Sequence, residues 1–110
     1  DNTIVVFSSD HGDMLGSQGR FQKLLPFEES AGVPLIVRGP GIPAGRKVSM
    51  PVSLLDLPVT LIALAGGKIP ERMQGRDLTP AIRGGDLAAR PVLLEGALHK
   101  PDREWRAIVK

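Results

Sequence analysis

The apolar run Ile4-Val5-Val6-Phe7 constrains the fold more than any other feature of this 110-residue chain. Consecutive apolar residues predict a strand that is buried on both faces, as in the middle of a parallel sheet covered by helices on each side. In such α/β proteins the ligands bind beyond the carboxyl ends of the strands. Asp10 and His11 follow shortly after this strand. We therefore expect these two side chains at the place where an α/β protein binds its ligand.

The pair Asp10-His11 can contribute to a metal site. A carboxylate oxygen beside an imidazole nitrogen supplies two ligands of a kind that divalent metals take. Gly12 allows either an unusual turn or a close approach of the backbone to a ligand. The same residues also suit an ordinary turn, in which Asp10 caps a following helix and His11 is merely exposed. Both interpretations stay open on these residues alone.

Several further segments follow this pair in a characteristic order. Any one of them is weak, whereas the ordered set covers nearly the whole chain. Together they resemble the sulfatases, which belong to the alkaline-phosphatase superfamily with the arylsulfatases and phosphonate monoester hydrolases. The segments are Ser9–Gly16, Gly19, Lys23, Pro26–Glu29, Val33–Val37, Ser53–Leu61, Gln74–Pro80 and Arg83–Gly84.

The resemblance implies an α/β fold, in which the chain forms part of an alkaline-phosphatase-like layered sheet with flanking helices. Residues 1–110 are predicted to be an internal to C-terminal fragment of a single catalytic domain, because whole sulfatases are several times longer. The family's nucleophile is a Cys or Ser in a Cys/Ser-x-Pro-x-Arg motif, oxidised to formylglycine, and this chain contains no cysteine. We expect that residue upstream. We also expect residues 4–7 to be partly unpaired and the fragment alone to be inactive.

The resemblance also implies roles for three side chains. Asp10 and His11 are expected to hold one divalent metal, with calcium as the first expectation and manganese or zinc as alternatives, because imidazole suits the latter two. Lys23 is expected to contact the sulfate or phosphate oxygens, and with His11 it is a candidate catalytic residue. A compact ammonium suits a tetrahedral anion. The alternative for Lys23 is a solvated loop lysine.

The function that follows is the metal-dependent hydrolysis of a sulfate ester, either a small molecule or a glycan. Cations that neutralise the charge on the ester oxygens are an efficient way to accelerate this reaction. A phosphonate monoester or phosphodiester hydrolase of the same fold is the close alternative. A non-catalytic or truncated relative is the third possibility.

Composition excludes two other classes of partner. The net charge is +2, the charges are interspersed and only four residues are aromatic, so nucleic acid is not an expected partner. No apolar run approaches the ~20 residues that span a bilayer. A periplasmic, secreted or cytoplasmic location is equally compatible with the composition.

Some residues near the candidate site carry weaker expectations. Gln18 stands where many relatives have a histidine, and it cannot carry a proton near neutral pH, which predicts a change in leaving-group handling or specificity. Glu28 and Glu29 are adjacent on a helical turn, so they cannot flank one scissile bond. We expect a structural role for them, for instance as a charge partner of Arg20, Lys23 or Arg38. Asp13 is expected to cap the loop, with support of a metal ligand as the alternative.

Other polar residues are expected to have structural or solvated roles. His99 is predicted to be exposed in a loop, and Trp105 to lie in the core or over the edge of a sheet. Arg46-Lys47 is predicted to be a solvated pair. The segment Gly75-Arg76-Asp77 is predicted to be structural, with Asp77 capping a short helix.

The clearest predicted helix covers residues 54–65. Ser53 or Asp56 caps it, Gly66-Gly67 ends it, and helical spacing predicts a core stripe of four leucines, Leu54, Leu57, Leu61 and Leu64. The other expected elements are a loop over 13–22, a helical turn within 25–31, a strand over 33–38, a turn over 39–45, an extended piece over 47–52, a helix over 77–83, and strands over 91–95 and 105–109.

Overall fold

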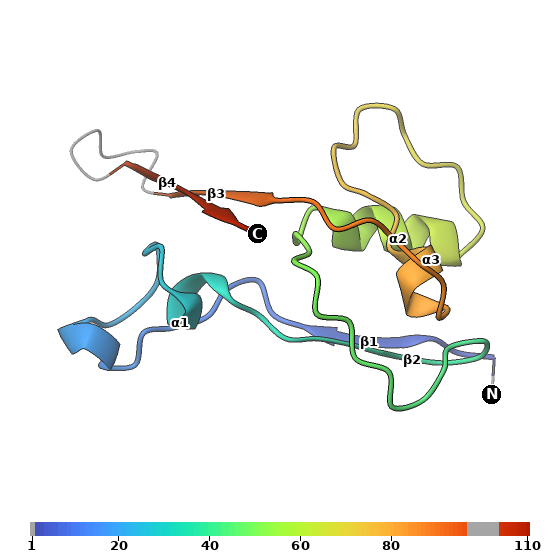
Figure 1. The fold of residues 1–110 in the computed structure, drawn as a ribbon, viewed down its shortest axis with the longest axis horizontal. Coiled ribbons are helices and arrows are strands. Elements are labelled where there is room, and N and C mark those ends of the chain that lie inside the picture. The colour runs from blue at the N-terminus through green and yellow to red at the C-terminus, as the bar shows by residue number, and fades with distance from the viewer. Residues whose placement is uncertain (1, 97–103) are drawn as a thin grey trace. The chain divides into compact units, whose positions relative to one another are not determined.

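The computed structural model describes residues 2–96 and 104–110, and these residues mix short helices with short strands (Figure 1). This agrees with the expected α/β character. The elements lie close to their predicted positions. In chain order they are β1 (Val5–Ser8), a 3-10 turn (Ser17–Gly19), α1 (Glu28–Ala31), β2 (Leu35–Arg38), α2 (Asp56–Leu64), α3 (Thr79–Ile82), β3 (Val92–Gly96) and β4 (Trp105–Val109).

The described strands form two separate sheets of two strands each, β1 with β2 and β3 with β4. Strands β3 and β4 are antiparallel, with Val92 opposite Val109 and Gly96 opposite Trp105. The predicted strand at residues 4–7 is present as β1, but it is not buried on both faces, because Val5 is 50% and Phe7 60% exposed. With a single partner strand, β1 keeps one edge unpaired within the described residues, as the sequence predicts.

The described chain divides into two compact units. The first comprises residues 2–5, 37–90 and 110, and the second comprises residues 6–36, 91–96 and 104–109, so the boundary passes through β1 and β2. Helices α2 and α3 belong to the first unit, whose buried apolar residues are Val59, Leu78 and Ala81. Helix α1 and the β3–β4 hairpin belong to the second unit, in which Met14 and Val92 are buried.

Helix α2 begins with a reciprocal pair of hydrogen bonds. The backbone N–H of Ser53 donates to Oδ2 of Asp56 over 3.0 Å, and Ser53 Oγ accepts from the N–H of Leu55 over 3.2 Å. This resembles a capping box, except that Ser53 Oγ accepts from Leu55 and not from Asp56, and it favours the first of the two predicted caps. At the other end Gly66 has a φ of 71°, and the N–H of Gly67 donates to Ile62 O over 2.9 Å. Gly66-Gly67 therefore ends the helix as predicted.

The predicted leucine stripe of α2 is wrong as the buried face. The buried residues of the helix are Asp56, Val59 and Thr60, whereas Leu61 is 43% exposed and lines, with Leu64, a pocket of about 560 Å³. Apolar residues lie on both sides of α2, so spacing alone cannot choose the buried face. No helix within residues 2–96 and 104–110 has the length and apolarity that crossing a membrane requires.

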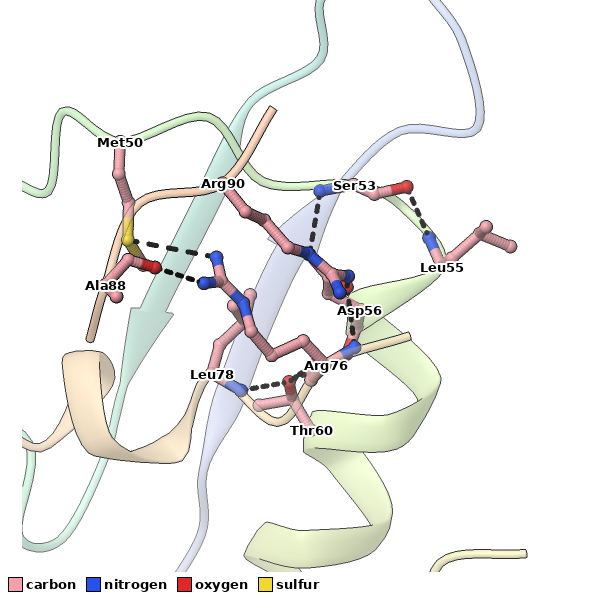
Figure 2. A network of polar contacts seen from close by, with 9 residues as sticks. All are labelled: Met50, Ser53, Leu55, Asp56, Thr60, Arg76, Leu78, Ala88 and Arg90. Carbon is pink, nitrogen blue, oxygen red and sulfur yellow. Dashed lines mark hydrogen bonds and ion pairs between the residues drawn. The ribbon is translucent and has the colours of Figure 1, made fainter. Parts of the chain in front are cut away.

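A buried carboxylate joins three segments of the first unit (Figure 2). Asp56 Oδ1 accepts from the backbone N–H of Arg76 over 2.7 Å and from Nη2 of Arg90 over 2.8 Å. Thr60 Oγ1 donates to Asp56 O over 2.7 Å and accepts from the N–H of Leu78 over 2.9 Å. A buried charge is stable only when it is compensated, and here a guanidinium and two backbone donors compensate it. The structural role predicted for Arg76 is confirmed.

Helix α3 is held at both ends by side chains. Asp77 Oδ1 accepts from the N–H of Thr79 over 2.8 Å, which confirms the predicted cap. The guanidinium of Arg46 donates to the carbonyl oxygens of Gly84 and Gly85 over 3.0 and 3.1 Å. Arg46 is exposed, as predicted. Its guanidinium also satisfies free carbonyl groups just beyond the end of the helix, a contact that the sequence did not predict.

The predicted extended piece over residues 47–52 forms no strand in the structure. Pro51 has no N–H to donate to a ladder, which confines proline to edges and strand starts. None of the four described strands pairs with this segment. The segment is therefore an irregular connection that leads into α2.

Candidate active site

The segment after β1 is held tightly against α1. The backbone N–H of Gly12 donates to Ser30 O over 2.9 Å. A Cβ atom at position 12 would overlap Glu29 O, so only glycine fits this close approach. Further on, the N–H of Met14 donates to Gln22 O over 2.9 Å, and the Met14 side chain is 1% exposed. These contacts fix the backbone on which Asp10 and His11 stand.

The two ring nitrogens of His11 have different partners. Nδ1 lies 2.7 Å from Gly12 O, and Nε2 lies 2.6 Å from Nζ of Lys23. A carbonyl oxygen can only accept, so Nδ1 carries the proton; an ammonium can only donate, so Nε2 presents its lone pair. The structure therefore brings His11 and Lys23 together across twelve residues, in a geometry that assigns one tautomer to the ring.

Asp10 completes this cluster on its exposed side. Its Oδ2 lies 3.4 Å from His11 Nε2, and its side chain is 85% exposed, against 37% for His11. The pKa of the Asp10 carboxyl is lowered, chiefly by a hydrogen bond from its own backbone N–H, then by the electrostatic influence of His11, with a smaller contribution from Lys23. The carboxylate thus stays ionised to a lower pH than an isolated aspartate.

Lys23 lies in a strained stretch of loop. Its neighbours Gln22 and Leu24 have φ values of 67° and 71°, and Leu15 and Gln18 also lie in the left-handed region, with φ values of 47° and 54°. For residues other than glycine this conformation costs about 1–2 kcal/mol each. Such strain persists where surrounding contacts determine the backbone, and it is common at ligand clamps. The loop was expected from its glycines, but its strain was not.

The remaining candidates near the cluster have structural or solvated positions. Asp13 Oδ1 accepts from the N–H of Leu15 over 2.9 Å, so it caps the loop. Gln18 is exposed. Glu28 and Glu29 form no ion pair within the described residues, so the charge partners named as an example of their structural role are not found. Both stand in the first turn of α1, where the helix dipole favours acidic groups. His99 lies outside the described residues.

The donor atoms of Asp10 and His11 suit one divalent cation. Two ligands that each lie roughly 2.0–2.5 Å from an ion are separated by about 3–3.5 Å, and the 3.4 Å between Oδ2 and Nε2 agrees with this. An all-oxygen site would favour calcium, whereas a carboxylate with a ring nitrogen also suits manganese or zinc. Within residues 2–96 and 104–110, no group of three His, Cys, Asp or Glu residues is placed to hold a metal. These residues therefore bring together two possible ligands.

Comparison with known proteins relates these features to one family. Residues 1–67 match the family model described as Sulfatase. Human arylsulfatase K is 45% identical over 78 residues, which are 71% of this chain and 15% of the human protein.

Solved structures agree in fold over most of the chain. BT4656, in complex with its substrate D-glucosamine-2-N,6-O-disulfate, matches 99% of this chain and 24% of its own, with a TM-score of 0.88 and 30% identity. The phosphonate monoester hydrolase SpPMH from Silicibacter pomeroyi matches 84% of this chain and 19% of its own, with a TM-score of 0.80 and 32% identity. The chain thus spans less than a quarter of the length of these three relatives.

Proposed function

Because this chain belongs to the sulfatase family, we propose that the enzyme containing it hydrolyses sulfate esters with the help of one divalent cation. The observation that carries the proposal is the meeting of Asp10, His11 and Lys23, in which the imidazole Nε2 lies within 3.4 Å of both the carboxylate and the ammonium. These three groups lie beyond the end of β1. The carboxylate and the imidazole can bind a cation, and the ammonium can bind an anionic ester.

Asp10 Oδ2 and His11 Nε2 would hold the cation, with calcium as the first expectation and manganese or zinc as alternatives. When bound, the cation would neutralise negative charge on the ester oxygens. The hydrogen bond from Nδ1 to Gly12 O supports this role, because it turns the Nε2 lone pair outward and keeps the ring in one orientation. Further ligands, with the formylglycine, are expected from the sequence upstream.

Lys23 would bind the oxygens of the ester group. Its ammonium already reaches His11 Nε2, and that lone pair can serve only one cation at a time. If His11 Nε2 held the cation, the Lys23 ammonium would have no acceptor there and could donate to an oxygen of the sulfate ester instead. The positive charge of Lys23 would then stabilise the charge that develops in the transition state.

We place residues 1–110 within a single catalytic domain of alkaline-phosphatase type, whose layered sheet β1 and β2 would join. The exposure of apolar residues on these strands supports this view, since Val5, Phe7 and Ile36 are 50–60% exposed. A strand with this composition is ordinarily covered on both faces. The match of 99% of the chain to the structure of BT4656 supports it further.

The substrate is proposed to be a small-molecule or glycan sulfate ester. One structural relative binds a disulfated glucosamine as its substrate, which favours a sugar sulfate. A phosphonate monoester or phosphodiester is the second candidate, and the match to a phosphonate monoester hydrolase, together with the imidazole ligand, favours it. The third possibility, a non-catalytic relative, would hydrolyse neither of these two kinds of ester.

The deciding experiment compares the hydrolysis of 4-nitrophenyl sulfate and of a phenyl phosphonate ester by the full-length enzyme, with and without added metal. We expect faster turnover of the sulfate ester. Faster turnover of the phosphonate would replace the lead proposal with the second candidate. The absence of a Cys or Ser followed by x-Pro-x-Arg upstream would exclude the formylglycine mechanism.

A further inference from the structure

A tryptophan far along the chain is bonded to the residue next to Lys23. The indole Nε1–H of Trp105, the first residue of β4, donates to Leu24 O over 2.9 Å. The two residues are 81 positions apart in sequence. The bond ties the β3–β4 hairpin to the strained loop, both of which belong to the second unit.

The indole ring of Trp105 packs over a glycine on the neighbouring strand. Gly96 in β3 lies directly opposite Trp105 in the antiparallel register. A Cβ atom at Gly96 would overlap Cε2 and Cζ2 of the indole, so the ring lies over the glycine backbone. Glycine in a strand often marks such a close approach, and a cross-strand aromatic ring compensates for its missing side chain. The sequence predicted Trp105 in the core or over a sheet edge. The half-buried ring lies over Gly96 of this two-stranded sheet and donates its N–H to the loop.

Lys23 is fixed on both sides of its own backbone position. Gln22 and Leu24 both have left-handed φ values, and each of their carbonyl oxygens has one donor. Gln22 O accepts from the N–H of the buried Met14, and Leu24 O accepts from Trp105. Strained backbone of this kind relaxes when the contacts that impose it are removed. The direction in which the Lys23 side chain leaves the loop therefore depends on both donors.

We propose that Trp105 is a positioning residue for Lys23. Its N–H holds Leu24 O, and it thereby keeps the ammonium where it reaches His11 Nε2 and an oxyanion bound beside it. Trp105 does not contact the reacting atoms in this role, since it acts through the backbone of Leu24. The inference rests on the proposed function only in the identity of the anion that Lys23 binds.

The test uses Trp105→Phe in the full-length enzyme. Phenylalanine keeps an aromatic ring over Gly96 and removes the N–H donor. We expect kcat for the sulfate ester to fall by about three- to tenfold, because a small misplacement of a charged group weakens its interaction with the transition state. In a Lys23→Ala background the same change should cost nothing further, since the group that it positions is gone.

A purely structural role for Trp105 would lower kcat equally in both backgrounds, and that result would overturn the inference. Arg106→Ala is the matched control, because Arg106 is the next residue of β4 and pairs with Glu95 over 2.8 Å. It should leave kcat unchanged, and an equal loss there would also count against Trp105. Melting temperatures of all variants separate loss of fold from loss of position.

Binding of inorganic sulfate provides a readout that needs no turnover. Calorimetry on the metal-loaded full-length enzyme should show weaker sulfate binding for Trp105→Phe, and no effect of Trp105→Phe when Lys23 is already alanine. Unchanged sulfate affinity in the Trp105→Phe single variant would overturn the inference. If the wild-type enzyme cleaves neither the sulfate nor the phosphonate ester, the proposed function fails, and the sulfate-binding comparison still decides the role of Trp105.

Discussion

The carboxylates of Asp56 and Asp10 lie beside a guanidinium and an imidazole respectively, and they differ in how completely they are enclosed. The Asp56 side chain is fully buried and accepts from Arg90 and from two backbone N–H groups. The Asp10 side chain is 85% exposed and keeps most of its accepting capacity open. A satisfied buried carboxylate holds segments together, whereas an exposed one that keeps a low pKa remains available to a ligand. Exposure and unfilled acceptor capacity distinguish the candidate site from the structural cluster.

The largest expected effect concerns the buried carboxylate. Asp56→Ala would leave the guanidinium of Arg90 and the N–H groups of Ser53 and Arg76 without their acceptor. We expect a loss of about 2–4 kcal/mol in the free energy of unfolding, below the usual cost of breaking a buried pair because water reaches the arginine. Urea denaturation of the full-length enzyme measures it. Asp10→Ala is the control, for which we expect unchanged stability and weakened metal binding. If Asp10→Ala lost as much stability as Asp56→Ala, the two carboxylates would not differ in the way described.

The next effect concerns turnover. Lys23→Ala should lower kcat for the sulfate ester by about ten- to a hundredfold, because a cation near the developing charge is lost. Steady-state kinetics on the metal-loaded enzyme measure this. Arg20→Ala removes an exposed cation from the same loop and should change kcat little. Equal effects of the two substitutions would make Lys23 an ordinary surface charge.

A smaller effect concerns metal affinity, and it has the opposite sign. In Lys23→Ala the lone pair of His11 Nε2 loses its competing donor, so metal binding should become about two- to tenfold tighter, since one hydrogen bond to a charged group no longer has to be broken. Calorimetric titration with manganese or calcium measures this. Arg20→Ala separates loss of the contact from loss of a nearby positive charge. Unchanged or weaker affinity in Lys23→Ala would contradict the competition for one lone pair.

The smallest effect concerns the strained loop. Gln22→Gly removes a side chain from a left-handed position, where glycine is free of the steric cost. We expect a gain of about 0.5–1 kcal/mol in stability, reduced by the greater entropy of glycine in the unfolded chain. Thermal unfolding measures it. Ser17→Gly, at a neighbouring loop residue outside the left-handed set, should be neutral or destabilising, and a stabilisation there would show that the loop tolerates glycine generally.

Local features of this fold could be predicted because their causes lie within a few residues. The spacing of Ser53 and Asp56 indicates a capping box, and Gly66-Gly67 indicates the end of α2. The extended piece predicted over residues 47–52 forms no strand, since a strand also needs a neighbour to pair with. Such local features depend on which residues have a backbone N–H and which φ values they can adopt, and both follow from the residue types.

Contacts between distant segments could not be predicted in the same way. Asp56 was expected only as a cap, since nothing near it in sequence indicates that Arg90, 34 residues on, would approach. Asp10, His11 and Lys23 were found through a strand followed by polar residues and through a family resemblance. The hydrogen bond from Trp105 to Leu24 spans 81 residues and depends on the register of the β3–β4 pairing. That register places Trp105 opposite Gly96, and nothing near either residue in the sequence indicates it.

The missing Cβ at Gly12 has a mechanical consequence. Because the Gly12 backbone lies directly against Glu29 O and is bonded to Ser30 O, no slack separates the peptide after His11 from α1. A displacement of that helix by a fraction of an ångström would be passed on to the imidazole. The alignment of His11, the proposed metal ligand, therefore depends on α1, although no side chain of α1 belongs to the cluster of Asp10, His11 and Lys23.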